Sequence, residues 1–292
     1  MKKIAHIVNP VLVKPTSDLF VAQPITFESM RIAQQKASGN VVVDLFAVGY
    51  AEDAPVMPAG FQILPQLTRS VFDVGIFQQQ RKLPLLKDIL ERLYAGSEAD
   101  FCIYTNVDIG LQPDFYLKVN EFIDQGLDAF VINRRTISNG YTRLDELALM
   151  WAEVGEPHRG WDCFVFRRDL IPHFVLGDVC VGATRVGLAL LSNLVAYGRS
   201  FKEFKAEQLT FHIGDERQWL NPAFADYDAH NTHELKQILA TLESTQGPFG
   251  RETIPGSYVW RTRTFGRFYD LWARHVYLPP RLSIFLNRLL RD

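Results

Sequence analysis

The chain has little net charge, few cysteines and no long apolar run. Its 292 residues carry a formal net charge of -2, which argues against nucleic acid as the main partner because nucleic-acid-binding proteins present a basic face. Cys102, Cys163 and Cys180 lie in or beside apolar segments and cannot all pair with one another, as is typical of buried thiols in a reducing compartment. No apolar run reaches membrane-spanning length, and Asn9-Pro10 interrupts the first apolar segment too early for a signal peptide. We therefore expect a cytoplasmic protein.

Short apolar segments alternate with segments of helical spacing through the first half of the chain. The expected strands are residues 3–8, 41–48, 128–133 and one beginning at residue 101, and the expected helices are residues 26–37, 83–94 and 113–125. This alternation predicts an α/β fold with a mostly parallel sheet and helices on both faces. In the second half we expect a strand at 163–166, a helix at 186–197, strands at 201–204 and 209–213, and a loop over 214–230.

The segment from Phe101 to Asp108 is an apolar run that ends in polar side chains. Ligands of open α/β sheets bind at the carboxyl ends of strands. Asn106 and Asp108 at such an end suit a divalent cation that holds a phosphate, because hard cations prefer oxygen ligands. The alternative for Asp108 is a helix N-cap, but the next helical pattern begins at Pro113, a residue type favoured at the first helical position.

Three further polar side chains are candidate site residues. Asp162, which directly follows Trp161 and precedes the strand expected at 163–166, is either a general base, a group that holds substrate hydroxyls, or a turn residue. Asp178, which follows a glycine, is a similar candidate. His212 ends an expected strand, where its ring nitrogen is either a metal ligand or a structural group.

In these residues and their layout, the chain resembles the GT-A superfamily of nucleotide-sugar glycosyltransferases, over roughly residues 3–219. The resemblance implies a catalytic domain at 1–250, with a Rossmann-like nucleotide-binding half at about 1–135 and an acceptor half at about 136–250, followed by a helical tail at 251–292. It also implies a divalent cation, Mn²⁺ or Mg²⁺, held on the diphosphate by Asp108 and His212. The nucleotide-sugar-binding residues that it implies are Asn9, Pro10, Val11, Arg81, Lys82, Asn106 and Asp108.

Two positions depart from the pattern of that superfamily. Asn106 stands where the commoner metal motif has a second aspartate, which leaves the need for metal open. Many inverting members carry a Glu-Asp pair where this chain has residues 182–185, which contain no carboxylate. The stereochemistry therefore stays open: Asp162 or Asp178 is the catalytic base of an inverting enzyme, or orients sugar hydroxyls in a retaining one.

The resemblance implies a glycosyltransferase, of hexosyltransferase type, that moves a sugar from a nucleoside diphosphate to an acceptor hydroxyl. Its expected role is bacterial surface-glycan assembly, with a glycan or lipid-linked glycan as acceptor. The alternatives are a non-catalytic scaffold on the same fold, or a sugar-phosphate nucleotidyltransferase. The nucleotidyltransferase needs a glycine-rich loop after the first strand, and residues 8–13 contain no glycine.

The tail from Arg251 onward interleaves arginines with aromatic residues. That composition is typical of helices that lie in a membrane interface, here at the inner face of the membrane. The alternative is a pair of helices that pack on the catalytic domain with their arginines in solvent.

Overall fold

The structure is a computed structural model that describes residues 1–215 and 221–266. The chain divides into two compact units, residues 1–246 and the residues from Gly247 onward, whereas the sequence suggested a boundary at 251. The tail from residue 267, and with it most of the predicted membrane contact, lies outside the described residues. Among the helices of the described ranges, none is long and apolar enough to cross a membrane.

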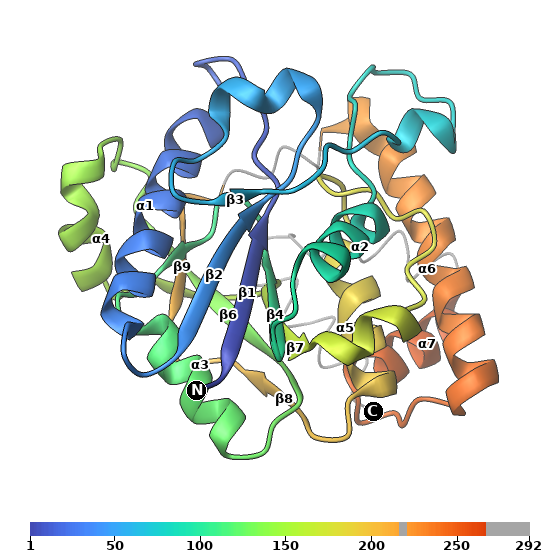
Figure 1. Ribbon diagram of the computed structural model, residues 1–292. Coiled ribbons are helices and arrows are strands. Elements are labelled where there is room, and N and C mark those ends of the chain that lie inside the picture. Colours follow the sequence, from blue (N-terminus) through green and yellow to red (C-terminus); the bar gives the residue numbers. More distant parts are fainter. Residues whose placement is uncertain (216–220, 267–292) are drawn as a thin grey trace. The chain divides into compact units, whose positions relative to one another are not determined.

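Nine strands of the first unit form one sheet, in the order β3-β2-β1-β4-β7-β6-β9-β5, with β8 beside β6 (Figure 1). They are β1 (Lys3–Val8), β2 (Val42–Ala47), β3 (Gln62–Ile63), β4 (Phe101–Thr105), β5 (Gly110–Leu111), β6 (Ala129–Ile137), β7 (Glu156–Arg167), β8 (Phe201–Phe204) and β9 (Thr210–Ile213). Strands β7 and β5 run antiparallel to their neighbours, and the other pairings are parallel. The carboxyl ends of the parallel strands therefore share one edge of the sheet.

Helices cover both faces of this sheet (Figure 1). Those of the first unit are α1 (Leu19–Ala37), α2 (Leu86–Gly96), α3 (Phe115–Asp124), α4 (Leu147–Ala152), α5 (Val186–Tyr197) and α6 (Ala225–Gln246). Helices α1 and α3 lie on one face, whereas α5 packs on β7 and β6 and contacts α6. The second unit contributes α7 (Ile254–Phe265). The predicted α/β class, a mostly parallel sheet between helical layers, is confirmed.

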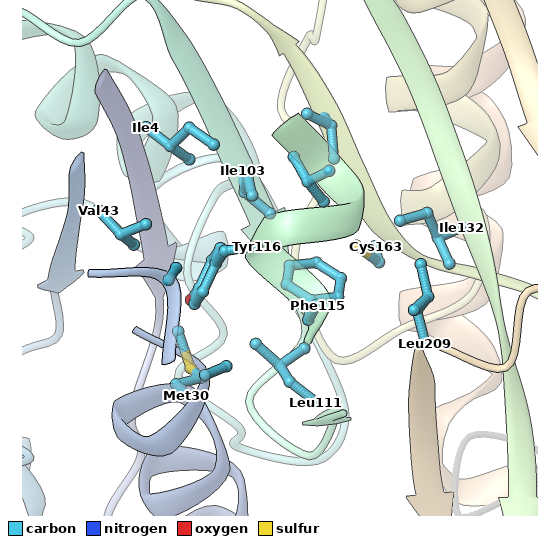
Figure 2. Packing of buried hydrophobic residues seen from close by; sticks show 14 of the residues in the cluster. Ile4, Met30, Val43, Ile103, Leu111, Phe115, Tyr116, Ile132, Cys163 and Leu209 are labelled. Carbon is cyan, nitrogen blue, oxygen red and sulfur yellow. The ribbon is translucent and has the colours of Figure 1, made fainter. Parts of the chain in front are cut away.

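Buried side chains of α1 and α3 fix the sheet to its helices. Figure 2 shows Met30 of α1 and Phe115 and Tyr116 of α3 against Ile4 and Ile103 of the sheet, and all five are fully buried. Each apolar side chain of this size stabilises the fold by about 1.5–3 kcal/mol when it leaves water. The strand ends at the polar edge therefore project from a close-packed support.

Two expectations for the second half are wrong. Asp162 lies within β7, because β6 and β7 pair as far as Thr136 and Glu156 and so extend the strand well before Cys163. The expected loop at 214–230 includes the start of α6 at Ala225. A short turn over Pro222–Phe224 precedes that helix, and the Asn221 side chain caps the turn by accepting from the Ala223 N–H at 3.0 Å.

Candidate functional site

Pairing of two short strand segments brings the polar residues after β4 to the end of β9. Asn106 and Asp108 follow β4, and β5 then pairs with β9 through Gly110 and Phe211. A Cβ atom at Gly110 would lie 2.3 Å from Cζ of the Phe211 ring, so a glycine is required for this close approach. The pairing places Asp108 beside His212, which is 104 residues away in the sequence.

Asp108 and His212 form a largely buried pair. His212 Nε2 lies 3.2 Å from Asp108 Oδ2, and the two side chains are 6% and 21% exposed, respectively. Burial alone would raise the pKa of Asp108, but the charge and hydrogen bond of His212 and the charge of Arg134 outweigh it and lower that pKa. Burial likewise opposes a charge on His212, yet Asp108 raises its pKa above the ordinary value. Each partner therefore favours the charged form of the other.

The ligand atoms that this pair offers suit a divalent cation. Asp108 Oδ1 is buried and takes part in no hydrogen bond. The His212 Nδ1–H donates to the Gly214 carbonyl at 2.8 Å, which leaves Nε2 as the ligating nitrogen of the neutral ring. Within residues 1–215 and 221–266 no third His, Cys, Asp or Glu joins them in a metal-binding group. A cation held by few protein ligands completes its shell with substrate phosphates and water.

Asn106 and Arg134 hold Asp162 from two sides. The Asn106 Nδ2–H donates to Asp162 Oδ1 at 2.9 Å. Arg134, on β6, forms an ion pair with Asp162 Oδ2 at 3.0 Å, and its side chain is only 5% exposed. Burial raises the pKa of Tyr104, and the nearby charges of Asp108 and Asp162 raise it further. Asp162 and Asp108 thus belong to one cluster.

Arg134 is a site residue that the sequence analysis missed. Its Nη2 is 4.0 Å from Asp215 Oδ1, its charge acts on both Asp108 and His212, and its buried Nε has no hydrogen-bond partner. The missed signal was a pair of charged residues following the apolar start of β6, the same pattern that singled out Asn106 and Asp108 after β4.

The loops that follow β1 and β2 are tied together beside this cluster. The Asn9 amide donates to the Val48 carbonyl at 2.6 Å. The buried Asp53 accepts from the Leu12 N–H at 2.8 Å and from the Tyr50 N–H at 2.9 Å, so one carboxylate connects the two loops. The sequence analysis did not single out Asp53, although it too is a polar residue shortly after a strand.

Lys82 reaches the β2 loop from a distant segment. Its ammonium lies 4.0 Å from the centre of the Tyr50 ring and 2.6 Å from Glu52 Oε1. The hydrogen bond with Lys82 is the largest cause of the lowered pKa of Glu52. Lys82 therefore lies at the same sheet edge as Asn9, Pro10 and Val11.

Arg81, by contrast, is engaged by the start of α6. Its guanidinium lies 4.4 Å from the centre of the Phe224 ring, and its N–H donates to the Tyr227 hydroxyl at 3.0 Å. These contacts anchor the segment that carries Lys82.

Asp178 lies in a different polar cluster. Its carboxylate is 3.5 Å from Arg69, which also pairs with Asp88 of α2, and its backbone N–H donates to Glu234 at 2.9 Å. Within the described part of the chain, Asp178 shares no hydrogen-bond or ion-pair partner with Asp108, Asp162 or His212. Asp162 is therefore the better placed of the two candidate carboxylates.

The chain is similar to solved structures at low sequence identity. No protein-family model matches the sequence, and no curated protein matches it. S. aureus TarS 1-349 in complex with UDP-GlcNAc is similar over 84% of this chain and 74% of its own, with 12% identity and a TM-score of 0.47. M. tuberculosis glucosyl-3-phosphoglycerate synthase is similar over 84% of this chain and 81% of its own, with 16% identity and a TM-score of 0.42. At these identities and TM-scores the likeness bears on no residue's role.

The mostly parallel sheet, its helices on both faces and the polar edge after β4 agree with the architecture implied by the resemblance. The described chain has a mostly parallel α/β fold with helices on both faces of the sheet and a C-terminal helix.

Proposed function

We propose that the protein is a glycosyltransferase that transfers a sugar from a nucleoside diphosphate sugar to an acceptor hydroxyl. The observation that carries the proposal is the Asp108–His212 pair at the carboxyl edge of the sheet, with the buried Asp108 Oδ1 free of hydrogen bonds. A fold of this type binds ligands at that edge. A scaffold without catalysis has no need of a buried carboxylate with an unused oxygen, which costs free energy.

The nucleotide of the donor belongs on the β1 and β2 side of the edge. Asn9, Pro10 and Val11 follow β1, and the Asp53 carboxylate holds their loop against the loop after β2. The Lys82 side chain is 43% exposed, so its ammonium is able to exchange its contact with Glu52 for a phosphate oxygen. Stacking of Arg81 on Phe224 and the hydrogen bonds of Tyr227 position this lysine.

Asp108 and His212 would hold a divalent cation, Mn²⁺ or Mg²⁺, on the diphosphate. When bound, such an ion supplies positive charge to the leaving group. The chain itself adds the buried guanidinium of Arg134, whose charge acts on both residues of the pair. Asn106, next to Asp108 but engaged with Asp162, connects the donor side with the acceptor side.

Asp162 is the residue we assign to the acceptor side. The Asn106 amide donates to Asp162 Oδ1, and the Arg134 guanidinium pairs with the buried Oδ2, which fixes the carboxylate but leaves Oδ1 able to accept one further hydrogen bond. A carboxylate held in this way orients a hydroxyl of the acceptor or the sugar, and in an inverting reaction it also receives the hydroxyl proton.

Calorimetric titration of the full chain with UDP, GDP and CDP sugars, each with and without Mn²⁺, tests the proposal. We expect one nucleotide series to bind and Mn²⁺ to tighten it. Asp108→Asn should remove the effect of Mn²⁺, whereas Asp114→Asn, at the start of α3, should not. Failure of every sugar nucleotide to bind would favour the scaffold.

A role in surface-glycan assembly, at the inner face of the membrane, is a further part of the proposal. Its support is the arginine- and aromatic-rich composition of residues 251–292, most of which lie outside the described residues. Each arginine near an anionic surface contributes about 1 kcal/mol, and salt weakens the attraction. Flotation with anionic and neutral liposomes tests it: binding to neither contradicts the membrane contact and leaves the transferase activity untouched.

A further inference from the structure

We propose that Asn106 is a positioning residue for Asp162, and that position 106 requires an amide because it faces a carboxylate. The expected effect on turnover rests on the proposed function, but the contact between Asn106 and Asp162 exists in the protein without ligands. It gives the departure from the two-aspartate motif a physical reason.

The side chain of Asn106 is used at both of its ends. Its Nδ2–H donates to Asp162 Oδ1 at 2.9 Å, and its Oδ1 accepts from the Tyr104 hydroxyl at 3.3 Å. The backbone N–H of Asn106 also donates to the Asp162 carbonyl at 3.3 Å. An aspartate would accept from Tyr104 equally well, but it has no donor for Asp162.

Arg134 completes the arrangement on the other oxygen. The Asp162 side chain is 13% exposed, and its Oδ2 lies 3.0 Å from the Arg134 guanidinium. Asp162 on β7 is thus held from the end of β4 and from β6. Three strands define the direction of one carboxylate, which is the rigidity that a group orienting a hydroxyl needs.

An aspartate at position 106 would bring two carboxylates to hydrogen-bond distance. Like charges so close disfavour each other's ionised form, and Arg134 supplies only one positive charge to the pair. Asn106→Asp should therefore weaken the site, although it restores the commoner metal motif. The opposite expectation follows if residue 106 is a metal ligand, since a second carboxylate would then tighten the cation.

Mn²⁺ titration of the full chain in the presence of UDP separates these outcomes, together with urea unfolding of the unliganded protein. We expect Asn106→Asp to lower the unfolding midpoint more than Asn106→Ala does. We also expect it to leave the Mn²⁺ dissociation constant unchanged or to increase it. Turnover is measured as release of the nucleoside diphosphate from whichever of the UDP, GDP or CDP sugars the wild type accepts. It should fall about tenfold or more, as expected for a lost hydrogen bond to a charged group. The dissociation constant of that sugar nucleotide should stay within about twofold of wild type, since uniform binding is not affected.

The exchanged variant Asn106→Asp/Asp162→Asn tests the pair directly. It restores one donor opposite one acceptor, so its unfolding midpoint should exceed that of Asn106→Asp alone. Asn120→Asp is the matched control, because the Asn120 amide donates to Asp124 at 3.0 Å in an exposed contact on α3. It should lower the unfolding midpoint but leave turnover unchanged.

Two results for Asn106→Asp would overturn the inference. One is Mn²⁺ binding about tenfold tighter than in the wild type, and the other is tighter Mn²⁺ binding with an unchanged unfolding midpoint, since the second carboxylate would then be a ligand. The inference would also be overturned if the change in unfolding midpoint of the double variant equalled the sum of the changes in the two single variants. Absence of nucleotide binding by the wild type would instead contradict the proposed function, and the unfolding measurements would still decide on the Asn106–Asp162 pair.

Discussion

His212 Nε2 lies 3.2 Å from Asp108 Oδ2, and the two residues come from the ends of strands that belong to opposite halves of the chain. The contact depends on the pairing of β5 with β9, because β5 follows shortly after Asp108 and β9 contains His212. Within residues 1–215 and 221–266, no other side chain forms a hydrogen bond or an ion pair with either residue. This pair is therefore the first target for mutation.

Replacing Asp108 by asparagine should abolish most turnover and leave the fold intact. The change removes the charge but preserves the shape, and the side chain packs at the edge of the sheet rather than in its core. We expect a loss of about a hundredfold or more, equivalent to about 3 kcal/mol or more of transition-state stabilisation. Product release and circular dichroism measure the two effects, and normal turnover or an unfolded variant would contradict the assignment.

Asp162→Asn should reduce turnover by roughly a hundredfold. An amide at this position cannot accept from Asn106 and pair with Arg134 as the carboxylate does. The dissociation constant of the donor, measured by calorimetry, should change little because Asp162 lies on the acceptor side. Asp178→Asn is the control, and a larger loss from that variant would move the assignment to the Arg69 cluster.

Lys82→Met should raise KM for the donor and leave kcat nearly unchanged. The methionine keeps the apolar stem over the Tyr50 ring but removes the charge that we assign to a donor phosphate. We expect KM to rise about tenfold, the amount of one charge-assisted contact. Lys87→Met, on the surface of α2, should have no effect. A fall in kcat alone would place Lys82 at the reacting bond instead.

His6 should make the stability of the protein depend on pH. Burial lowers the pKa of His6 to about 3, whereas an unfolded histidine has a pKa of 6.5. Between those values the unfolded state binds more protons, so the free energy of unfolding rises with pH and this contribution is lost as pH falls below 6.5. From pH 7.5 to pH 5.5 the loss is about 1.4 kcal/mol.

Urea unfolding of wild type and His6→Gln at these two pH values measures that contribution. The variant lacks the ring that bonds Tyr116 and Thr105, so it is less stable at both values. Its stability should nevertheless change less between them. An identical change in the two proteins would show that His6 is not held neutral.

Arg135→Lys should destabilise the fold without touching the site. The Arg135 guanidinium is buried and donates to the carbonyls of Met150, Trp151, Glu153 and Gln208, so it closes the end of α4. A lysine has one nitrogen in place of three, and each carbonyl left without a donor costs about 1–3 kcal/mol. We expect a loss of several kcal/mol in urea unfolding; the same change at Arg92, which bonds two carbonyls in an exposed setting, should cost less.

The sequence predicted those parts of the structure that local pattern determines. Apolar runs identified β1, β2 and β4, and α5 has the predicted bounds because its apolar residues end at Gly198. Asp108 and His212 were selected because each follows or ends a strand, and the structure brings them together. Their roles as ligands remain predictions.

The features that sequence analysis missed depend on long-range pairing. Asp162 was expected before a short strand, but β6 extends β7 by pairing with it through an irregular register at Asn133. Arg134 lies in the same irregular segment, where alternation gives no sign of which face a charged residue occupies. The sequence predicts a loop where α6 begins, because Phe224 and Tyr227 contact Arg81 and Phe77 and do not form a regular helical stripe.

The pairing of Gly110 with Phe211 also has a consequence for the order of folding. The strands β1, β2 and β4 can associate as soon as about the first hundred residues have left the ribosome, since domains begin to fold during synthesis. Contacts between residues so distant in sequence close slowly, and β9 emerges only after the whole of β6 and β7. We therefore expect the Asp108–His212 contact to be among the last to form, so that recovery of cation binding during refolding should lag behind recovery of secondary structure.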